Sequence, residues 1–252
     1  MLHRLRRFID LPIRATDGEI GKIKDVYFDD HQWVVRYLVV DTSWLLGRQV
    51  LISTISVGGL DREDSVVQVR LTRNQIEASP DIDTNKPVSR QHEVGYFDYY
   101  GYPYYWNGPA LWGATSNPVL PFGTVPNAPG PTGDAPIDPH LRSVNAVTGY
   151  RIHSSDAPIG HVEDFLLDEI SWAIRYLVVD TRNWLPGKHV VIPPEWITGM
   201  DWSENVVNVD VTRDTVQAAP EYHTGMDFSR VQETHLYRHY QRPSYWQQTP
   251  GS

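Results

Sequence analysis

The 252-residue sequence contains no cysteine and has fewer basic than acidic residues, and each of these shortages excludes a class of protein. Without cysteine there is no disulfide framework, no thiolate nucleophile and no thiolate-bound metal cluster. Lysine and arginine total 22 against 31 aspartates and glutamates, which gives a formal net charge of -9. Because such a chain lacks the basic surface that holds a phosphate backbone, we expect no nucleic acid among its partners.

Long apolar runs are also missing. No window of the sequence approaches the roughly 18 uncharged apolar residues that a membrane-spanning helix requires. The segment Met1–Asp10 begins with basic residues, but the apolar stretch of about 7 to 15 residues that completes an export signal does not follow it. We therefore expect no transmembrane segment and a cytoplasmic location.

What the sequence does contain is an internal duplication. Residues 17–42 read DGEIGKIKDVYFDDHQWVVRYLVVDT and residues 156–181 read DAPIGHVEDFLLDEISWAIRYLVVDT. Thirteen of these 26 positions are identical at a constant offset of 139. After a one-residue insertion the correspondence continues to Tyr105-Trp106 and Tyr245-Trp246. Two copies of a module of about 90 residues are therefore expected to fold alike.

A segment rich in proline and glycine separates the two copies. Residues 107–136 contain seven prolines and five glycines, and Asp134 carries their only formal charge. This composition is typical of a linker, although its few large apolar side chains allow partial ordering. We predict a first unit at residues 1–106, the linker at 107–136, a second unit at 137–246 and a frayed end at 247–252.

The periodicity within each copy is that of β-strands followed by short helices. In the first copy we predict strands at Ile20–Phe28, Trp33–Val40, Gln49–Ile52 and Val66–Leu71. The expected helix N-caps are Thr72 and Ser89, with Thr212 and Ser229 at the matching places of the second copy. The strand at Trp33–Val40 is apolar on both faces, so it must be covered on both sides. A small closed or nearly closed barrel with a capping helix satisfies this requirement.

One arginine interrupts this apolar strand in each copy. Arg36 and Arg175 stand among valines and leucines, and a buried guanidinium needs a carboxylate partner. Asp25 and Asp164 lie on the neighbouring strand at equivalent positions. We therefore predict two structural ion pairs, Asp25–Arg36 and Asp164–Arg175.

Each copy ends in a tail rich in aromatic residues. Tyrosine and tryptophan combine a large contact area with a polar group, and they dominate binding hot spots. The candidate interaction surface comprises Tyr99, Tyr100, Tyr102, Tyr104, Tyr105, Trp106, Tyr240, Tyr245 and Trp246. The same side chains can instead wrap a barrel of this chain, so internal packing and partner binding remain alternatives.

Sequence patterns of catalysis and metal binding are few. No phosphate-binding glycine loop, dinucleotide-binding glycine pattern or G-x-S-x-G elbow occurs. His235 and His239 are one helical turn apart, and the turns Asp29-Asp30 and Asp168-Glu169 bring carboxylates together. An exposed helix face and solvated turns explain these groups more simply. We predict no catalytic residue, no cofactor and no metal site.

The duplicated motif resembles a known family. Ile20-Gly21, Asp25, Asp29 and the run from Arg36 to Asp41, repeated from Ile159 to Asp180, resemble the PRC-barrel family. That family includes the cytoplasmic domain of the photosynthetic reaction centre H subunit, the C-terminal domain of a ribosome maturation factor and many stand-alone bacterial proteins. The resemblance implies a six-stranded antiparallel β-barrel in each half and a role in binding proteins. The membrane-spanning helix of H subunits and the extra N-terminal barrel of the maturation factor have no counterpart in this sequence.

Together these patterns predict a mainly β protein of two tandem small antiparallel PRC-type β-barrels, each with a short capping helix and an aromatic-rich tail. We expect the two units to pack together as an intramolecular pseudo-dimer and to act as a non-enzymatic module that binds another protein. Two alternatives remain open. One is an accessory role in photosynthetic electron transfer, by analogy with the H subunit, and the other is a hydrolase with its site between the two units.

Overall fold

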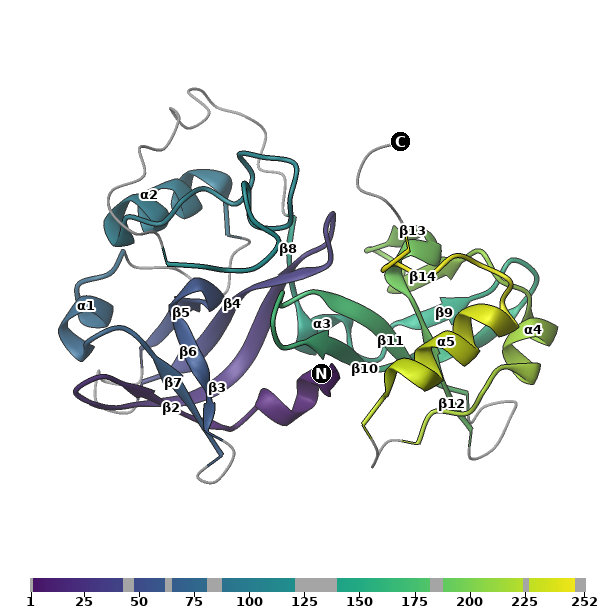
Figure 1. Cartoon of the computed structure of the whole chain (residues 1–252). Helices are drawn as coiled ribbons and strands as arrows, with labels where there is room; N and C mark the ends of the chain where they lie inside the picture. The colour runs from purple at the N-terminus through teal and green to yellow at the C-terminus, as the bar shows by residue number, and fades with distance from the viewer. Residues whose placement is uncertain are drawn as a thin grey trace. The chain divides into compact units, whose positions relative to one another are not determined.

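The computed structural model describes residues 2–42, 48–61, 65–80, 88–120, 140–181, 188–223 and 227–247. Within these residues the chain is mainly β and forms two similar units, each with a sheet followed by helices (Figure 1). Each unit also contains a cluster of aromatic rings near its last helix. The N-terminal unit spans Arg7–Ala146 with Ile170–Ala173, and the C-terminal unit spans Met1–Arg6, Val147–Glu169 and Ile174–Ser252. The predicted mainly β fold class is confirmed.

The N-terminal unit is built on a seven-stranded sheet. Its strands are β2 (Pro12–Ala15), β3 (Gly18–Asp29), β4 (Val34–Asp41), β5 (Gln49–Ser53), β6 (Val57–Asp61), β7 (Val66–Val69) and β8 (Leu141–Ser143). They follow the order β5-β4-β3-β2-β7-β6, and β8 pairs with β3. The helices of this part of the chain are η1 (Leu5–Phe8), η2 (Thr54–Ser56), α1 (Arg73–Glu77) and α2 (Arg90–Tyr100).

The C-terminal unit repeats this arrangement. Its strands are β1 (Leu2–Arg4), β9 (Arg151–His153), β10 (Pro158–Asp168), β11 (Ile174–Asp180), β12 (His189–Ile192), β13 (Ile197–Asp201) and β14 (Val206–Val209). Their order is β12-β11-β10-β9-β14-β13, and β1 pairs with β10. The remaining helices are α3 (Val144–Val147), η3 (Pro194–Trp196), α4 (Arg213–Ala218) and α5 (Arg230–His239).

The expected six antiparallel strands per half need a correction. Each sheet has seven strands, and one pair in each is parallel, β2 with β7 and β9 with β14. These parallel partners are far apart in the sequence, and no hairpin turn joins them. Strands β2 and β6 were not expected from the sequence, because both are short and β6 contains Gly58-Gly59, so their local strand signal is weak.

The structure also divides the chain differently from the predicted boundaries. Strand β1, at the start of the first copy, pairs with β10 of the C-terminal unit, and β8, at the start of the second copy, pairs with β3 of the N-terminal unit. The register is the same in both, since Leu2 lies opposite Asp168 and Leu141 lies opposite Asp29. The two sequence copies therefore exchange their opening strands, and this exchange supplies the seventh strand of each sheet.

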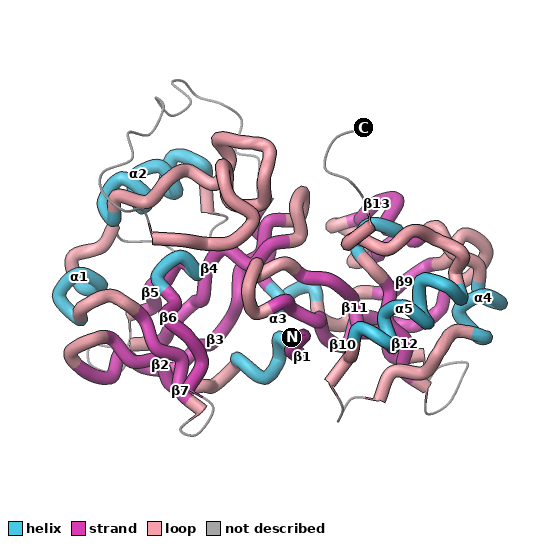
Figure 2. Tube along the Cα trace, viewed as in Figure 1, coloured by secondary structure: helices cyan, strands magenta, loops and turns pink. Residues whose placement is uncertain are grey.

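The prediction that the return strand is covered on both faces is confirmed. All residues of β4 from Val34 to Val40 are buried. Helix α2 covers the β4–β5 side of the sheet (Figure 2), where Tyr96 contacts the ring of Tyr37 edge-on and bonds to the backbone of β5. Four helices begin at the predicted N-cap residues. The side chains of these residues each accept a backbone N–H of the following turn: Thr72, Ser89, Thr212 and Ser229.

Part of the predicted linker belongs to the N-terminal unit. Residues 107–120 are described, and they include the buried Trp112. The rest of the predicted linker and residues 248–252 of the predicted frayed end lie outside the described residues. The predicted packing of the two units as a pseudo-dimer stays a prediction.

A repeated glycine lets neighbouring strands approach closely. A Cβ atom at Gly21 would lie 1.8 Å from the carbonyl oxygen of Asp41, and one at Gly160 would lie 2.1 Å from that of Asp180. Both distances are far shorter than any van der Waals contact, and the obstacle in each case is backbone. The two copies therefore depend on glycine at the same position of the strand.

We expect Gly21→Ala to lower the free energy of unfolding by on the order of 2–3 kcal/mol, because the added methyl group must displace the β4 backbone. Gly95→Ala is the matched control. Gly95 is exposed in α2 with open space around it, and alanine there should stabilise by about 0.5–1 kcal/mol through its higher helix propensity. Urea unfolding of both variants measures the difference, and equal effects would contradict the close-approach argument.

Candidate functional site

A buried glutamate under the capping helix organises the polar interior of the N-terminal unit. The side chain of Glu93 in α2 has no solvent exposure. Its Oε1 accepts hydrogen bonds from the hydroxyls of Tyr37 at 3.0 Å and Tyr105 at 2.7 Å. Its Oε2 lies 2.9 Å from Arg90 Nη1 and 2.9 Å from His140 Nε2. The buried carboxylate thus has partners on both oxygens, as its desolvation demands.

The C-terminal unit carries the same arrangement around Glu233 in α5. Its Oε1 accepts from the hydroxyls of Tyr176 at 2.9 Å and Tyr245 at 3.0 Å. Arg230 Nη1 lies 3.0 Å from Oε2. Glu93 and Glu233 follow the repeated Ser-Arg pairs at the helix starts by the same spacing. That repetition is the signal by which the sequence could have indicated both glutamates.

The tyrosines around these carboxylates remain hydroxyl donors. Burial first, and the negative charge of Glu93 second, raise the pKa of Tyr37 and Tyr105 well above the ordinary value. Burial first, then the neighbouring Tyr237 and the negative charge of Glu233, raise the pKa of Tyr176. These groups therefore stabilise the glutamates as neutral donors.

Arg36 is buried beside this cluster. Its side chain has no solvent exposure, and burial lowers the pKa of its guanidinium. It donates to Asp29 Oδ2 at 3.2 Å and to the carbonyl of Leu111 at 2.7 Å. The guanidinium carbon lies 3.7 Å from the ring centre of Tyr105 and 4.6 Å from that of Trp112. An arginine placed in this way combines an ion pair with two cation–π contacts.

The predicted pair Asp25–Arg36 is wrong. The structure pairs Arg36 with Asp29, whereas Asp25 accepts from Ser143 Oγ of β8 at 2.5 Å and from the backbone N–H of Asn145 at 3.2 Å. The physical reason is the irregular β3–β4 ladder, whose register shifts at two places. The sequence gives the strands but not the bulges, and each bulge turns the following side chains to a new direction.

The predicted pair Asp164–Arg175 is wrong for the same reason. Asp164 pairs with Arg4 of β1, with Nε and Oδ2 2.7 Å apart, and also accepts the backbone N–H of Arg6. Arg175 pairs with Asp168 at 3.4 Å. The β10–β11 ladder has bulges at the places that correspond to those of β3–β4. Asp25 and Asp164 thus hold the exchanged opening strands, and Asp29 and Asp168 hold the arginines.

Four of the nine residues of the candidate aromatic surface are buried. Tyr102, Tyr104, Tyr105 and Tyr240 are buried, so for these four members of the candidate interaction surface the structure shows internal packing, the other alternative. The hydroxyl groups of three of these tyrosines have hydrogen-bond partners inside the unit, which makes their burial possible. Tyr102 bonds to Ser56, Tyr104 bonds to Asp98 and Tyr105 bonds to Glu93. Tyr100, Trp106 and Tyr245 are half-buried, and only Tyr99 and Trp246 of the nine residues are exposed.

In the described part of the chain, the acidic turn Asp29-Asp30 and His239 of the histidine pair contact other groups of their own unit. The ligand atoms of Asp29, Asp30 and His31 lie within 4.8 Å of one another. Both carboxylates already contact arginines, because Arg36 pairs with Asp29, and Arg142 pairs with Asp30 at 2.7 Å. In α5, a ring nitrogen of His239 lies 2.9 Å from the carbonyl of Thr215.

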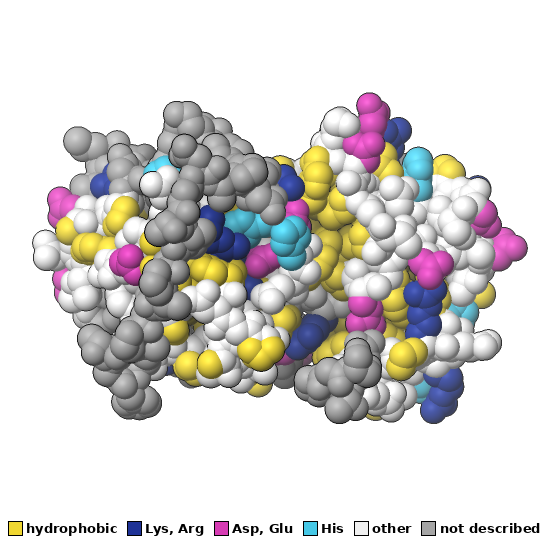
Figure 3. Space-filling view, turned by 90° about the horizontal axis from the view of Figure 1, so that it is seen from above, with side chains coloured by type: hydrophobic (Ala, Val, Ile, Leu, Met, Phe, Trp, Pro, Cys, Tyr) yellow, Lys and Arg dark blue, Asp and Glu magenta, His cyan; other side chains and the backbone are white. Residues whose placement is uncertain are grey.

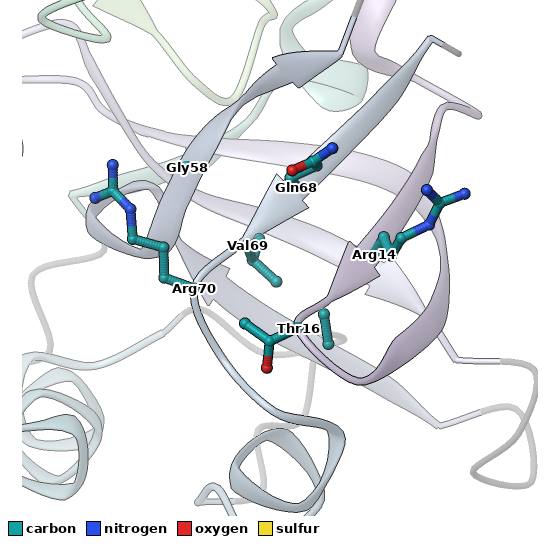
Figure 4. Close-up of a pocket in the computed structure, with 7 residues that line it drawn as sticks. Arg14, Thr16, Gly58, Gln68, Val69 and Arg70 are labelled. Atoms are coloured by element: carbon teal, nitrogen blue, oxygen red, sulfur yellow. The ribbon is translucent and has the colours of Figure 1, made fainter.

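A separate cavity of about 440 Å³ opens on the N-terminal unit. Strands β2 and β7, with Gly58 of β6, line it, and Arg14 and Arg70 stand on either side (Figure 4). The residues at the corresponding positions of the second copy are His153 and Asp210. The cationic character of this cavity is therefore not repeated.

Residues 2–76 match the family model of the PRC-barrel domain. This part of the chain is a PRC-barrel domain. A comparison with curated proteins found no match. The second sheet unit repeats the strand order of this PRC-barrel domain, which suggests a tandem. Among the described helices there is none with the length and apolar character that a membrane span requires.

A double-mutant cycle distinguishes the observed ion pair from the predicted one. We expect Asp29→Asn and Arg36→Met to show a coupling energy of about 1–3 kcal/mol, as for side chains in one network. Asp25→Asn combined with Arg36→Met should be additive within about 0.5 kcal/mol. The free energies of unfolding of the five variants provide both values. Strong coupling in the second pair and none in the first would reverse the assignment.

Asp25, which accepts a hydrogen bond from the exchanged strand β8, should make the free energy of unfolding depend on pH. Burial raises the pKa of Asp25 above its ordinary 3.8, against hydrogen bonds from Ser143 and the backbone that lower it. Its contribution to stability is therefore fully present below pH 3.8 and is lost as the pH rises through the folded-state pKa. Between pH 3.8 and the folded-state pKa, we therefore expect the free energy of unfolding of the wild type to fall relative to that of Asp25→Asn.

Asp156 provides a control of opposite sign. A hydrogen bond from Ser154, and then one from the backbone N–H of Arg213, lower its pKa below 3.8. Relative to Asp156→Asn, the wild type should therefore lose stability as the pH falls below that value. Urea unfolding at a series of pH values measures both variants. If the difference in free energy of unfolding from the wild type changed with pH in the same direction for both, the two assignments would be contradicted.

Proposed function

We propose that the protein is a non-enzymatic module of two PRC-type barrels that binds another protein, with the cytoplasm as its location. One observation carries the proposal, an exposed cluster of arginine and aromatic side chains on the C-terminal unit. The guanidinium of Arg230 lies 4.0 Å from the ring centre of Trp246, and Trp246 is 37% exposed. Val231, the next residue of α5, is 64% exposed. Tryptophan, tyrosine and arginine are the side chains enriched at binding hot spots.

The acidic groups already have partners within their own units, and this favours a binding function over a catalytic one. Asp29, Asp30 and Asp168 each contact an arginine of their own unit, and Glu93 has four partners. These bonds explain the duplicated carboxylates as parts of the barrel. The hydrolase hypothesis depends on such carboxylates being available, and the electron-transfer hypothesis rests on resemblance alone, so both stay predictions.

The surface composition is compatible with protein binding. On the face shown in Figure 3, hydrophobic side chains reach the surface among charged ones. A mixed surface of this kind is common at interfaces between proteins that also exist separately.

Site-specific photocrosslinking in the native cell tests the proposal. We expect a photoreactive phenylalanine analogue at the exposed Gln247, next to Trp246, to give a discrete adduct with one protein. Additional substitution Trp246→Ala should abolish the adduct, because it removes the aromatic anchor. The same analogue at Glu204, an exposed turn residue, is the control. Absence of an adduct at Gln247, or equal labelling at both positions, would contradict the proposal.

A further inference from the structure

The cavity on the N-terminal unit combines two cations with a floor that carries no formal charge. Its lining consists of Arg14, Ala15, Thr16, Gly58, Gln68, Val69 and Arg70, and none of these seven residues is acidic. The whole chain has a formal net charge of -9, so two arginines around one cavity make this a local place that favours an anion. The volume of about 440 Å³ lies within the range of small-molecule sites.

The strand register explains why both arginines stand on one face of the sheet. Arg14 of β2 lies opposite Gln68 of β7, and Arg70 follows Gln68 by two residues. Because side chains alternate between the two faces of a strand, Gln68 and Arg70 share the exposed face, while Val69 between them is buried. Figure 4 shows Gln68 between the two arginines, with Arg14 on the β2 side and Arg70 on the β6 side.

Gly58 of β6 opens the floor of the cavity beside Arg70. A Cβ atom at this position would lie 3.5 Å from the carbonyl oxygen of Gln68 and 3.6 Å from Cγ of Arg70. These are ordinary van der Waals distances, so the backbone accepts a side chain here, but a longer one would reach toward the stem of the arginine. The second copy has Thr198 at the corresponding position. The open floor is therefore a property of the first copy.

The barrel itself does not require the positive charge at Arg70. In the C-terminal unit, Asp210 occupies the corresponding position and pairs with Arg242 at 3.0 Å. The same place in the sheet thus accepts a cation in one unit and an anion in the other. A structural role common to both sheets does not explain Arg70, whereas contact with an anionic ligand does.

The contacts of the lining residues leave recognition to the two guanidiniums. Nη2 of Arg14 lies 4.0 Å from Oε1 of Glu19, and these side chains are 41% and 79% exposed. An exposed pair at this distance contributes little to stability, so an incoming anion can displace Glu19. Oγ1 of Thr16 donates to the carbonyl of Leu71 at 3.3 Å, and its proton is therefore already in use.

We propose that this cavity binds an elongated organic dianion, a molecule with a carboxylate or phosphate group at each end. One anionic group pairs with Arg14 and the other with Arg70, because the two side chains lie on opposite sides of β7 (Figure 4). The uncharged middle of the ligand lies over Gly58 and Gln68. The planar guanidinium of arginine binds both kinds of oxyanion through two parallel hydrogen bonds. This inference goes beyond the proposed function, since it requires no partner protein.

Titration of the isotope-labelled full chain with acids of increasing length, followed by the NMR shifts of its backbone amides, tests the site. At low ionic strength we expect suberate to bind with a Kd of about 1 mM or lower. Succinate and acetate should bind at least about tenfold more weakly, because a short ion reaches only one guanidinium. The shifted amides should centre on Thr16, Gly58 and Gln68.

Hexanediol bisphosphate, a dianion of similar length, identifies the end group. A lower Kd for the bisphosphate than for suberate would support the site with phosphate as its preferred group. The opposite order would support it with carboxylate.

Variants of the chain locate the binding. Arg70→Asp, which introduces the residue type of the second copy, should weaken suberate at least about tenfold, and Arg14→Gln should weaken it in the same way without adding a negative charge. Gly58→Thr keeps both cations and should also raise the Kd, because it fills the floor. The matched control is Arg7→Asp. Arg7 is exposed in the same unit and does not line the cavity, so this variant has the net charge of Arg70→Asp and should keep the wild-type Kd. Circular dichroism establishes that the variants are folded.

Four results would overturn the inference. The first is the absence of amide shifts around the cavity at suberate concentrations up to about 10 mM. The second is equal weakening in Arg70→Asp and Arg7→Asp, which would assign the attraction to overall charge. The third is the same Kd for acetate and suberate, which would mean that the two arginines act separately. The fourth is an unchanged Kd in Gly58→Thr, which would place the ligand outside the cavity.

Discussion

The structure depends on the burial of an arginine on a strand that is covered on both sides. A guanidinium in that position must be paired and hydrogen-bonded, since an uncompensated buried charge costs on the order of 3–5 kcal/mol. Asp29 at the end of β3 supplies the carboxylate for Arg36, and Tyr105 of the aromatic tail supplies the ring. Tyr105 in turn is fixed by Glu93 of α2. Barrel, helix and tail are thus connected through one cation.

A second pair of carboxyls, the half-buried Asp25 and the buried Asp164, holds the exchanged strands. Asp25 and Asp164 receive the hydrogen bonds of β8 and β1, which are the opening strands of the opposite copies. Because burial raises the pKa of both carboxyls, these bonds are what keeps the two charges tolerable inside the sheets. The exchange therefore uses the same principle as the arginine sites, a desolvated charge with defined partners.

The contact between a strand arginine and a tail tyrosine is repeated in the two units. The pairs Arg36–Tyr105 and Arg175–Tyr245 occupy equivalent places, and Trp112 of the following segment lies over Arg36.

The sequence by itself determined the duplication, the main strands and the helix starts, because repeated residues, apolar alternation and the N-caps Thr72 and Ser89 are local signals. It did not determine the partners of Arg36 and Arg175, since β-bulges decide where each carboxylate points. Nor did it determine the exchange of β1 and β8 or the burial of Tyr102, Tyr104 and Tyr105. These depend on contacts between residues far apart in the chain, and only the tertiary structure brings such residues together.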